Sequence, residues 1–285
     1  MAKPVFSGHE SFACKSHWLK RGYDFVNEGN NFNADDAVVQ LGVGKNMVSS
    51  IRFWMRSFGV LDANGTLTPI AHYLLDSDTG CDPFFEDPGS LWLMHFLLME
   101  TNYATVYPVT FIEYHRQRNL IDKSKLQNFI KHSCFENSQY KNLYNENTVK
   151  RDIGVMIHNY CGKSNGSIED SNALLAPLNL VQESDKKDVY TFNSDTRSLV
   201  PPRIFLYAML SSFPDRKSVS FDEIAKLGLI FCLTNNEMLE LIKQLCSIYS
   251  DVIVFSDVAG IKELQFKGNL TKDQALADYY SLHYS

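Results

Sequence analysis

Residues 45–58 carry apolar and polar side chains at helical spacing. At about 100° per residue, the apolar positions fall on one side of a helix and a polar stripe falls on the opposite side. The apolar side is formed by Met47, Val48, Ile51, Trp54, Met55 and Phe58, and the stripe by Lys45, Ser49, Arg52 and Arg56. The pattern predicts an amphipathic helix with a core-facing side and a cationic front.

The flanking residues predict that this helix belongs to a winged helix-turn-helix. A shorter helix is expected to start at Ala34, with Asn33 as its N-cap, and to end before a glycine-containing turn at residues 42–44. After the longer helix, Asn64-Gly65 between apolar residues predicts a hairpin. Helix, turn, helix and hairpin thus follow one another in the order of such a unit.

The chemistry of the front suits DNA. In the major groove, arginine reads guanine with two hydrogen bonds and asparagine reads adenine, while lysine and serine hold phosphates. The candidate residues for binding double-stranded DNA are Lys45, Asn46, Ser49, Ser50, Arg52 and Arg56. Two alternatives stay open. The stripe also matches the ordinary solvated face of an amphipathic helix, and winged units also dock other proteins.

A second helix-turn-helix is expected in the middle of the chain. One helix covers residues 125–132, and a longer one begins at a cap formed by Asn145 or Asn147. The apolar and polar pattern over 174–192 predicts a turn and a strand that form a second wing.

Two cations stand near the start of that longer helix. Lys150 and Arg151 oppose the helix macrodipole there, so they do not stabilise the helix. They are candidates for DNA binding through a phosphate, and the alternative is a salt bridge within the chain to Asp152 or Glu146.

The C-terminal third has the same order of elements. A helix is predicted over 203–213, Thr234-x-x-Glu237 is a capping box that opens a helix over 235–248, and a hairpin and a last helix follow. The expected fold class is mainly α with small β wings (α+β), built from multiple winged helix-turn-helix-like units. The expected domains are 1–80 with the first winged unit, a helical middle domain 81–200 with the second, and 201–285 with the third.

Composition limits the class of protein. The net charge of −6 argues against a protein that coats nucleic acid indiscriminately, so DNA contact must come from a local basic surface. The six cysteines lie far apart with no C-x-x-C, which is typical of reduced thiols in a cytoplasmic protein without a zinc site. There is no signal-peptide pattern. The most apolar segment, 91–99, is too short to cross a membrane and predicts a buried helix with His95 in the core.

Catalytic candidates are sparse. The segment FSGHESF, residues 6–12, contains His9-Glu10, a pair suited to acid–base work, and the alternative is a structural role. Glu169-Asp170 is a pair of adjacent carboxylates that could hold a divalent metal, and the alternative role is helix capping. The sequence has no phosphate-binding loop, no dinucleotide-binding glycine pattern and no H-E-x-x-H. A nuclease site would therefore be assembled from separated residues, with His9 as general base and Glu10 as a contact to Mg²⁺ or Mn²⁺.

Seven blocks along nearly the whole chain are distinctive. They read FSGHESF, WLKRGYD, LGVGKNMVSSIRFW, VKRDIGVMIHNY, EDSNALLAPLNLV, DVAGIKEL and ADYY. Together they resemble a bacterial family of unknown-function domains whose members sit beside phosphorothioate DNA-modification genes. The first block is the most specific.

Within that family the chain is most similar to the DNA-nicking component of Ssp-type single-strand phosphorothioation systems. The resemblance implies DNA as substrate, nicking or handling of one strand for sulfur incorporation, and a role in antiviral defence. It also implies partners: a cysteine desulfurase, an ATPase and a PAPS-reductase-like protein. A homodimer is expected, because winged-helix proteins often pair to read two half-sites. The alternative is a non-catalytic DNA-binding adaptor, or a docking scaffold that uses aromatic surface such as Phe53.

Overall fold

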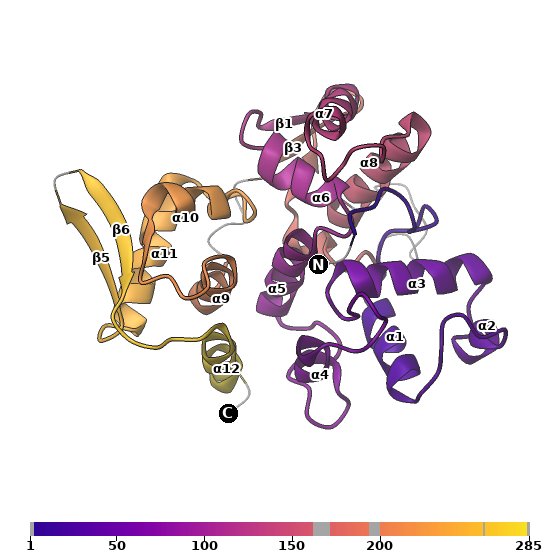
Figure 1. The fold of residues 1–285 in the computed structure, drawn as a ribbon, viewed down its shortest axis with the longest axis horizontal. Coiled ribbons are helices and arrows are strands. Elements are labelled where there is room, and N and C mark those ends of the chain that lie inside the picture. Colours follow the sequence, from indigo (N-terminus) through magenta and orange to yellow (C-terminus); the bar gives the residue numbers. More distant parts are fainter. Residues whose placement is uncertain (1–2, 162–171, 194–199, 259, 284–285) are drawn as a thin grey trace. The chain divides into compact units, whose positions relative to one another are not determined.

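The structure is a computed structural model that describes residues 3–161, 172–193, 200–258 and 260–283 (Figure 1). The chain divides into two units, Met1–Asn193 and Ser194–Ser285. Each unit contains helices and one three-stranded antiparallel sheet, so the class is mainly α with small β wings, as predicted. The predicted boundary between residues 80 and 81 falls inside the first unit, and the three-part division stays a prediction.

The first unit begins with four helices, and two of them set the position of the cationic front. Helix α3 (Lys45–Ser57) follows the predicted pattern, and its apolar side packs on α1 (Trp18–Asn27) and on the long helix α5 (Pro88–Thr101). The approach to α1 is close, because a side chain at Gly22 would clash with the Met55 sulfur. The other two helices are α2 (Ala37–Gln40) and α4 (Pro69–Leu75).

Two local predictions for this winged unit were wrong in detail. Helix α2 starts at Ala37 rather than Ala34, and Asn33 does not cap it, because the Asn33 Oδ1 instead accepts a hydrogen bond from Arg52 at 2.6 Å. The wing is reduced to one bridge between Leu61 and Leu67. Asp62 tightens the turn by accepting hydrogen bonds from two backbone N–H groups at 2.8 Å, which leaves little chain for a ladder.

Helix α5 (Pro88–Thr101) lies in the core of the first unit, as its apolar sequence predicts. Its N-cap is Asp87, whose Oδ1 accepts from the Gly89 N–H at 2.7 Å. His95 is fully buried, and its Nδ1 lies 2.7 Å from the Tyr160 hydroxyl, which confirms it as a core histidine. No helix in the described ranges is long and apolar enough to cross a bilayer.

The rest of the first unit joins helices to a small sheet. Helix α6 (Val106–Pro108) runs into the π-helix η1 (Val109–Tyr114). Helices α7 (Lys123–Glu136) and α8 (Glu146–Cys161) follow, and Asn145 caps α8 by accepting from the Thr148 N–H at 3.0 Å. After the 3₁₀-helix η2 (Ala176–Leu178), the sheet is completed in the order β1-β3-β2. Its strands are β1 (Leu120–Asp122), β2 (Val181–Glu183) and β3 (Val189–Phe192).

The second unit repeats the order of helix, helix and hairpin. Its helices are α9 (Pro202–Ser212), α10 (Phe221–Gly228), α11 (Asn235–Ile248) and α12 (Lys272–His283). Strands β4 (Ser218–Ser220), β5 (Ile253–Val258) and β6 (Ile261–Phe266) form the sheet β4-β6-β5. The predicted capping box is confirmed, because the Glu237 carboxylate accepts from the Thr234 N–H at 2.9 Å.

Candidate nucleic-acid interface

The front of α3 presents most of the predicted DNA-binding residues together. Lys45, Asn46 and Ser49 are exposed, while Arg52 and Arg56 are half-buried on the same face, one helical turn apart. Burial first, and the neighbouring Arg56 cation second, lower the pKa of Arg52. The two guanidinium groups therefore lie close enough to repel each other.

Within the described residues, this arginine pair forms no ion pair with an acid. The buried Arg56 Nε has no hydrogen-bond partner in the part of the chain that the structure describes. Arg52 donates a hydrogen bond to the neutral Asn33 Oδ1 at 2.6 Å. A half-buried cation that lacks a counter-ion is unfavourable, because burial weakens its hydration and a neutral partner replaces only part of it. On a solvated helix face, an acid at i, i+4 from a cation stabilises the helix. Helix α3 contains no acid at all, so an anion from outside the chain fits this surface.

A cavity of about 430 Å³ lies beside this arginine pair, between the loop that precedes α2 and the N-terminal half of α3. Lys45, Ser49 and Arg52 form its α3 side, and Asp35 contributes its one carboxylate. The front of α3 is therefore a groove with a cationic wall rather than a flat face.

Ser50 lies behind α3 and not on its front. It is fully buried, and its hydroxyl donates to the His9 carbonyl oxygen at 3.0 Å. Phe53 is also buried, at 5% exposure, so it cannot provide the exposed aromatic docking surface. The cause is the segment of residues 5–16, which covers this flank of the helix: Gly8 adopts a φ of +115°, and a Cβ there would come 2.5 Å from the Phe53 ring.

His9 is held in a buried network. Its Nε2 lies 2.8 Å from Asp152 Oδ1 on α8, and its Nδ1 accepts from the Ser11 N–H at 3.1 Å. The network therefore assigns the proton to Nε2, which donates to the carboxylate. The other oxygen of Asp152 accepts from the Ser7 N–H at 2.8 Å. Both ring nitrogens of His9 are engaged, and the residue is 2% exposed. In this geometry His9 holds the segment of residues 5–16 in place against α3 and α8.

The side chains of His9 and Glu10 do not share one site in the structure. Glu10 is exposed, with a φ of +47°, while His9 is buried. Ser7 and Ser11 also have positive φ values of 78° and 68°. Non-glycine residues in this region store strain that recurs at functional sites. The catalytic assignment of this pair stays a prediction, and in this geometry Glu10 is the member that solvent reaches.

The described residues do not assemble a metal site. They contain no group of three or more histidine, cysteine or acidic side chains placed to hold an ion. Asp152 is engaged by the His9 ring and the Ser7 N–H, so its oxygens are occupied. Glu169 and Asp170 lie outside the described residues. No catalytic step through a metal is therefore assigned.

Lys150 and Arg151 are exposed on α8. Neither makes the alternative salt bridge to Asp152 or Glu146, and across the described ranges neither forms an ion pair. Lys150 instead contributes to a positive region around Asp188, whose carboxylate pKa is lowered first by the Lys123 hydrogen bond and charge, and then by Lys187 and Lys150.

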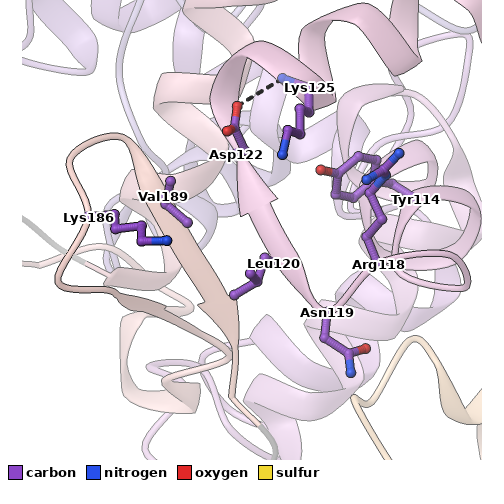
Figure 2. Close-up of a pocket in the computed structure, with 8 residues that line it drawn as sticks. All are labelled: Tyr114, Arg118, Asn119, Leu120, Asp122, Lys125, Lys186 and Val189. Carbon is purple, nitrogen blue, oxygen red and sulfur yellow. Dashed lines mark hydrogen bonds between the residues drawn. The ribbon is translucent and has the colours of Figure 1, made fainter.

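A second cationic region was missed by the sequence patterns. It surrounds the sheet β1-β3-β2 and includes a cavity lined by Arg118, Lys125 and Lys186 (Figure 2). The available signal was the basic cluster of residues 115–118, which by itself matches a solvated helix face. Lys125 follows seven residues later, on the first turn of α7, and Lys186 lies 68 residues after Arg118, on the β2–β3 turn.

Comparisons with known proteins give one family and two solved structures. The family described as "Protein of unknown function (DUF4007)" matches residues 6–280. A magnesium ion-bound SspB crystal structure is similar with a TM-score of 0.85 and 25% sequence identity, over 98% of this chain and 89% of that chain. A second SspB crystal structure has a TM-score of 0.83 with the same identity and coverage. A search of curated proteins found no match.

Proposed function

This chain belongs to the DUF4007 family of proteins of unknown function, and from that premise we propose that it is a DNA-binding component of an Ssp-type phosphorothioate DNA-modification system. The similarity to SspB over 98% of the chain supports the assignment to such a system. The observation that carries the DNA-binding part is the arginine pair of α3, Arg52 and Arg56, which has no carboxylate partner among the described residues.

The front of α3 would enter the major groove of a duplex. Its exposed N-terminal residues, Lys45 and Asn46, stand where recognition helices contact base edges. The arginine pair lies about two and three turns further along, within reach of a guanine edge or of phosphates. Because the whole chain carries a net charge of −6, this local surface would have to supply the attraction for DNA.

The same proposal includes handling or nicking of one strand for sulfur incorporation. The similar SspB structure contains a magnesium ion, and Mg²⁺ is commonly held by one or two carboxylates together with waters and substrate phosphates. The described residues of this chain do not assemble such a site, so we assign no residue a step in cleavage. A cysteine desulfurase, an ATPase and a PAPS-reductase-like protein are the proposed partners, with a homodimer as the proposed assembly.

The first test is a duplex-binding titration at two salt concentrations. Replacing both residues of the pair, Arg52→Ala/Arg56→Ala, removes two phosphate contacts and is expected to weaken binding at least about tenfold. The slope of log K against log salt should fall by about 1.8, since each contact contributes about 0.9. Lys226→Ala, an exposed cation on α10, is the matched control and should bind like wild type. Equal affinities for wild type and the arginine variant would rule out α3 as the interface.

A supercoiled-plasmid assay with Mg²⁺ or Mn²⁺ separates the nickase from the non-catalytic adaptor. Open-circle product that is lost in Glu10→Gln supports nicking and a role for the exposed acid. Salt-dependent binding without open-circle product favours the adaptor. Glu10 is preferred over His9 as the variant because an exposed side chain can be changed with little effect on stability.

A further inference from the structure

A cavity of about 430 Å³ lies within the first unit, away from α3. It is bounded by the end of the π-helix η1, the turn that follows it, strand β1, the first turn of α7 and the β2–β3 turn. Figure 2 shows the eight residues that line it. Its volume falls within the range of about 300–1,000 Å³ that small-molecule pockets occupy.

Three cations, Arg118, Lys125 and Lys186, form what we call the cationic rim of this cavity. In the part of the chain that the structure describes, none of the three forms an ion pair. The lining contains one carboxylate, Asp122, and its Oδ1 already accepts from the Lys125 backbone N–H at 3.0 Å as the N-cap of α7. Positive charge therefore dominates the cavity.

The acids next to the rim do not cancel this positive charge. Of the two acids on the β2–β3 turn, Asp188 is engaged by Lys123 at 2.8 Å, and Asp185 is exposed and does not line the cavity. Lys187 and Lys150 also act on Asp188 and help to lower its pKa. Asp188 is therefore surrounded by three lysines outside the rim and is not available to the rim.

Tyr114 provides an independent indication of a ligand. Its side chain is fully buried, and its hydroxyl has no hydrogen-bond partner in the described chain. The Asp122 backbone N–H is near, but without the geometry of a hydrogen bond. In Figure 2 the hydroxyl points toward the side of the cavity where Asp122 and Lys125 lie. Burial raises the pKa of Tyr114, so the hydroxyl stays protonated and can donate to an acceptor that enters the cavity.

The backbone and the apolar wall add two further features. Tyr114 ends the π-helix, in which the His115 N–H bonds to the Thr110 carbonyl oxygen at 3.0 Å, and π-turns recur at functional sites. On the opposite wall, Leu120 is 53% exposed and lies near Val189. The cavity therefore combines cations and a buried donor with an apolar surface.

We propose that this cavity binds the phosphate of a nucleotide. The cationic rim and the Tyr114 hydroxyl would hold the phosphate oxygens, and Leu120 and Val189 would contact the sugar or the base. The ligand is a free nucleotide or the phosphorylated end of a DNA strand, two sources with the same chemistry. The proposal does not rest on DNA binding by α3.

The test is calorimetric titration of the full chain with three probes: a nucleoside 5′-monophosphate, a single-stranded oligonucleotide with a 5′-phosphate, and the same strand with a 5′-hydroxyl. The variant Arg118→Gln/Lys186→Gln should bind the phosphate probes at least about tenfold more weakly than wild type, because it removes two charge-assisted contacts. Tyr114→Phe should weaken them a few-fold. The control, Lys226→Gln on α10, should bind like wild type.

The outcomes separate the two sources and can overturn the proposal. Tight binding of the monophosphate identifies a free nucleotide. A strong preference for the phosphorylated strand over both other probes identifies a strand end. Absence of binding by either phosphate probe, or equal affinity in wild type and the Arg118→Gln/Lys186→Gln variant, would overturn it. Arg52→Ala/Arg56→Ala should leave phosphate-probe binding intact, so a failure of duplex binding through α3 would count only against the proposed function.

Discussion

Helices α3 and α11 occupy equivalent places in two winged units, yet their fronts differ in chemistry. Each follows a shorter helix, packs an apolar side into a core, and precedes a turn or hairpin. Helix α3 carries three cations and no acid. Helix α11 carries two glutamates and one lysine, and Lys243 pairs with Glu240 at 2.7 Å. The shared architecture therefore does not by itself indicate DNA binding; the side chains on the front distinguish the two helices.

The two helices are also held in place differently. Helix α11 starts at the local capping box and packs on α9 and β5 of its own unit. Helix α3 starts at Gly44 without a side-chain cap, and its flank is fixed by the segment of residues 5–16. That segment is in turn tied to α8 through His9 and Asp152. The cationic helix thus depends on contacts that are distant in the sequence, while its counterpart depends on near ones.

The largest expected effect comes from removing the remote support of α3. In Asp152→Ala, the His9 Nε2–H and the Ser7 N–H both lose their acceptor inside the protein. Leaving two donors unsatisfied should reduce the free energy of unfolding by about 3 kcal/mol. Denaturant unfolding measures the change. Asp185→Ala, at an exposed acid in the same unit, should stay within about 0.5 kcal/mol of wild type. Similar midpoints for the two variants would contradict the role of Asp152.

A smaller effect is expected from making the front of α3 resemble that of α11. Ser49→Glu places a carboxylate on the exposed front, four residues after Lys45 and three before Arg52. Duplex binding should fall by roughly tenfold, because a negative charge faces the phosphates and competes for the cations. The unfolding free energy should change by no more than about 0.5 kcal/mol, since the new pairs slightly favour the helix.

The matched change on α11 is Glu240→Gln, which removes a carboxylate from the counterpart helix. It should leave duplex binding as in wild type. If Glu240→Gln alters binding as much as Ser49→Glu does, the distinction between the two fronts is mistaken.

The smallest expected effect concerns the local support of α11. Thr234→Ala removes the N-cap side chain of the capping box and should destabilise α11 by about 1 kcal/mol, with no change in duplex binding. Hydrogen exchange of the α11 amides measures this opening. Ser247→Ala, at an exposed position of the same helix, should exchange like wild type. Unchanged protection in Thr234→Ala would argue that the box contributes nothing in solution.

Sequence patterns predicted the parts of the fold that are determined locally. Helices α3 and α11 begin and end within a residue or so of the expected positions, because periodicity and caps act over a few residues. Strands β1 and β4 were missed, since three residues are too few to establish an alternating pattern. Their pairing partners, β3 and β6, lie far along the chain.

The site could be predicted only in part, for the same reason. The stripe of α3 follows from its own sequence, but the burial of Ser50 and Phe53 depends on a segment about 40 residues earlier. The partnership of His9 with Asp152 spans 143 residues, and no local signal indicates it. The cationic rim is likewise assembled from two regions of the sequence.

The tie between His9 and Asp152 has a consequence for synthesis of the chain on the ribosome. Helix α3 emerges early, but the carboxylate that fixes its covering segment is made 143 residues after His9. Helix α3 ends at Ser57, 95 residues before Asp152, so at about 5–20 residues per second roughly 5–19 s pass between synthesis of the helix and of that carboxylate. During this interval the cationic helix and the aromatic side chains behind it lack their final cover, so the packing of this part of the nascent chain is completed only after α8 has left the exit tunnel.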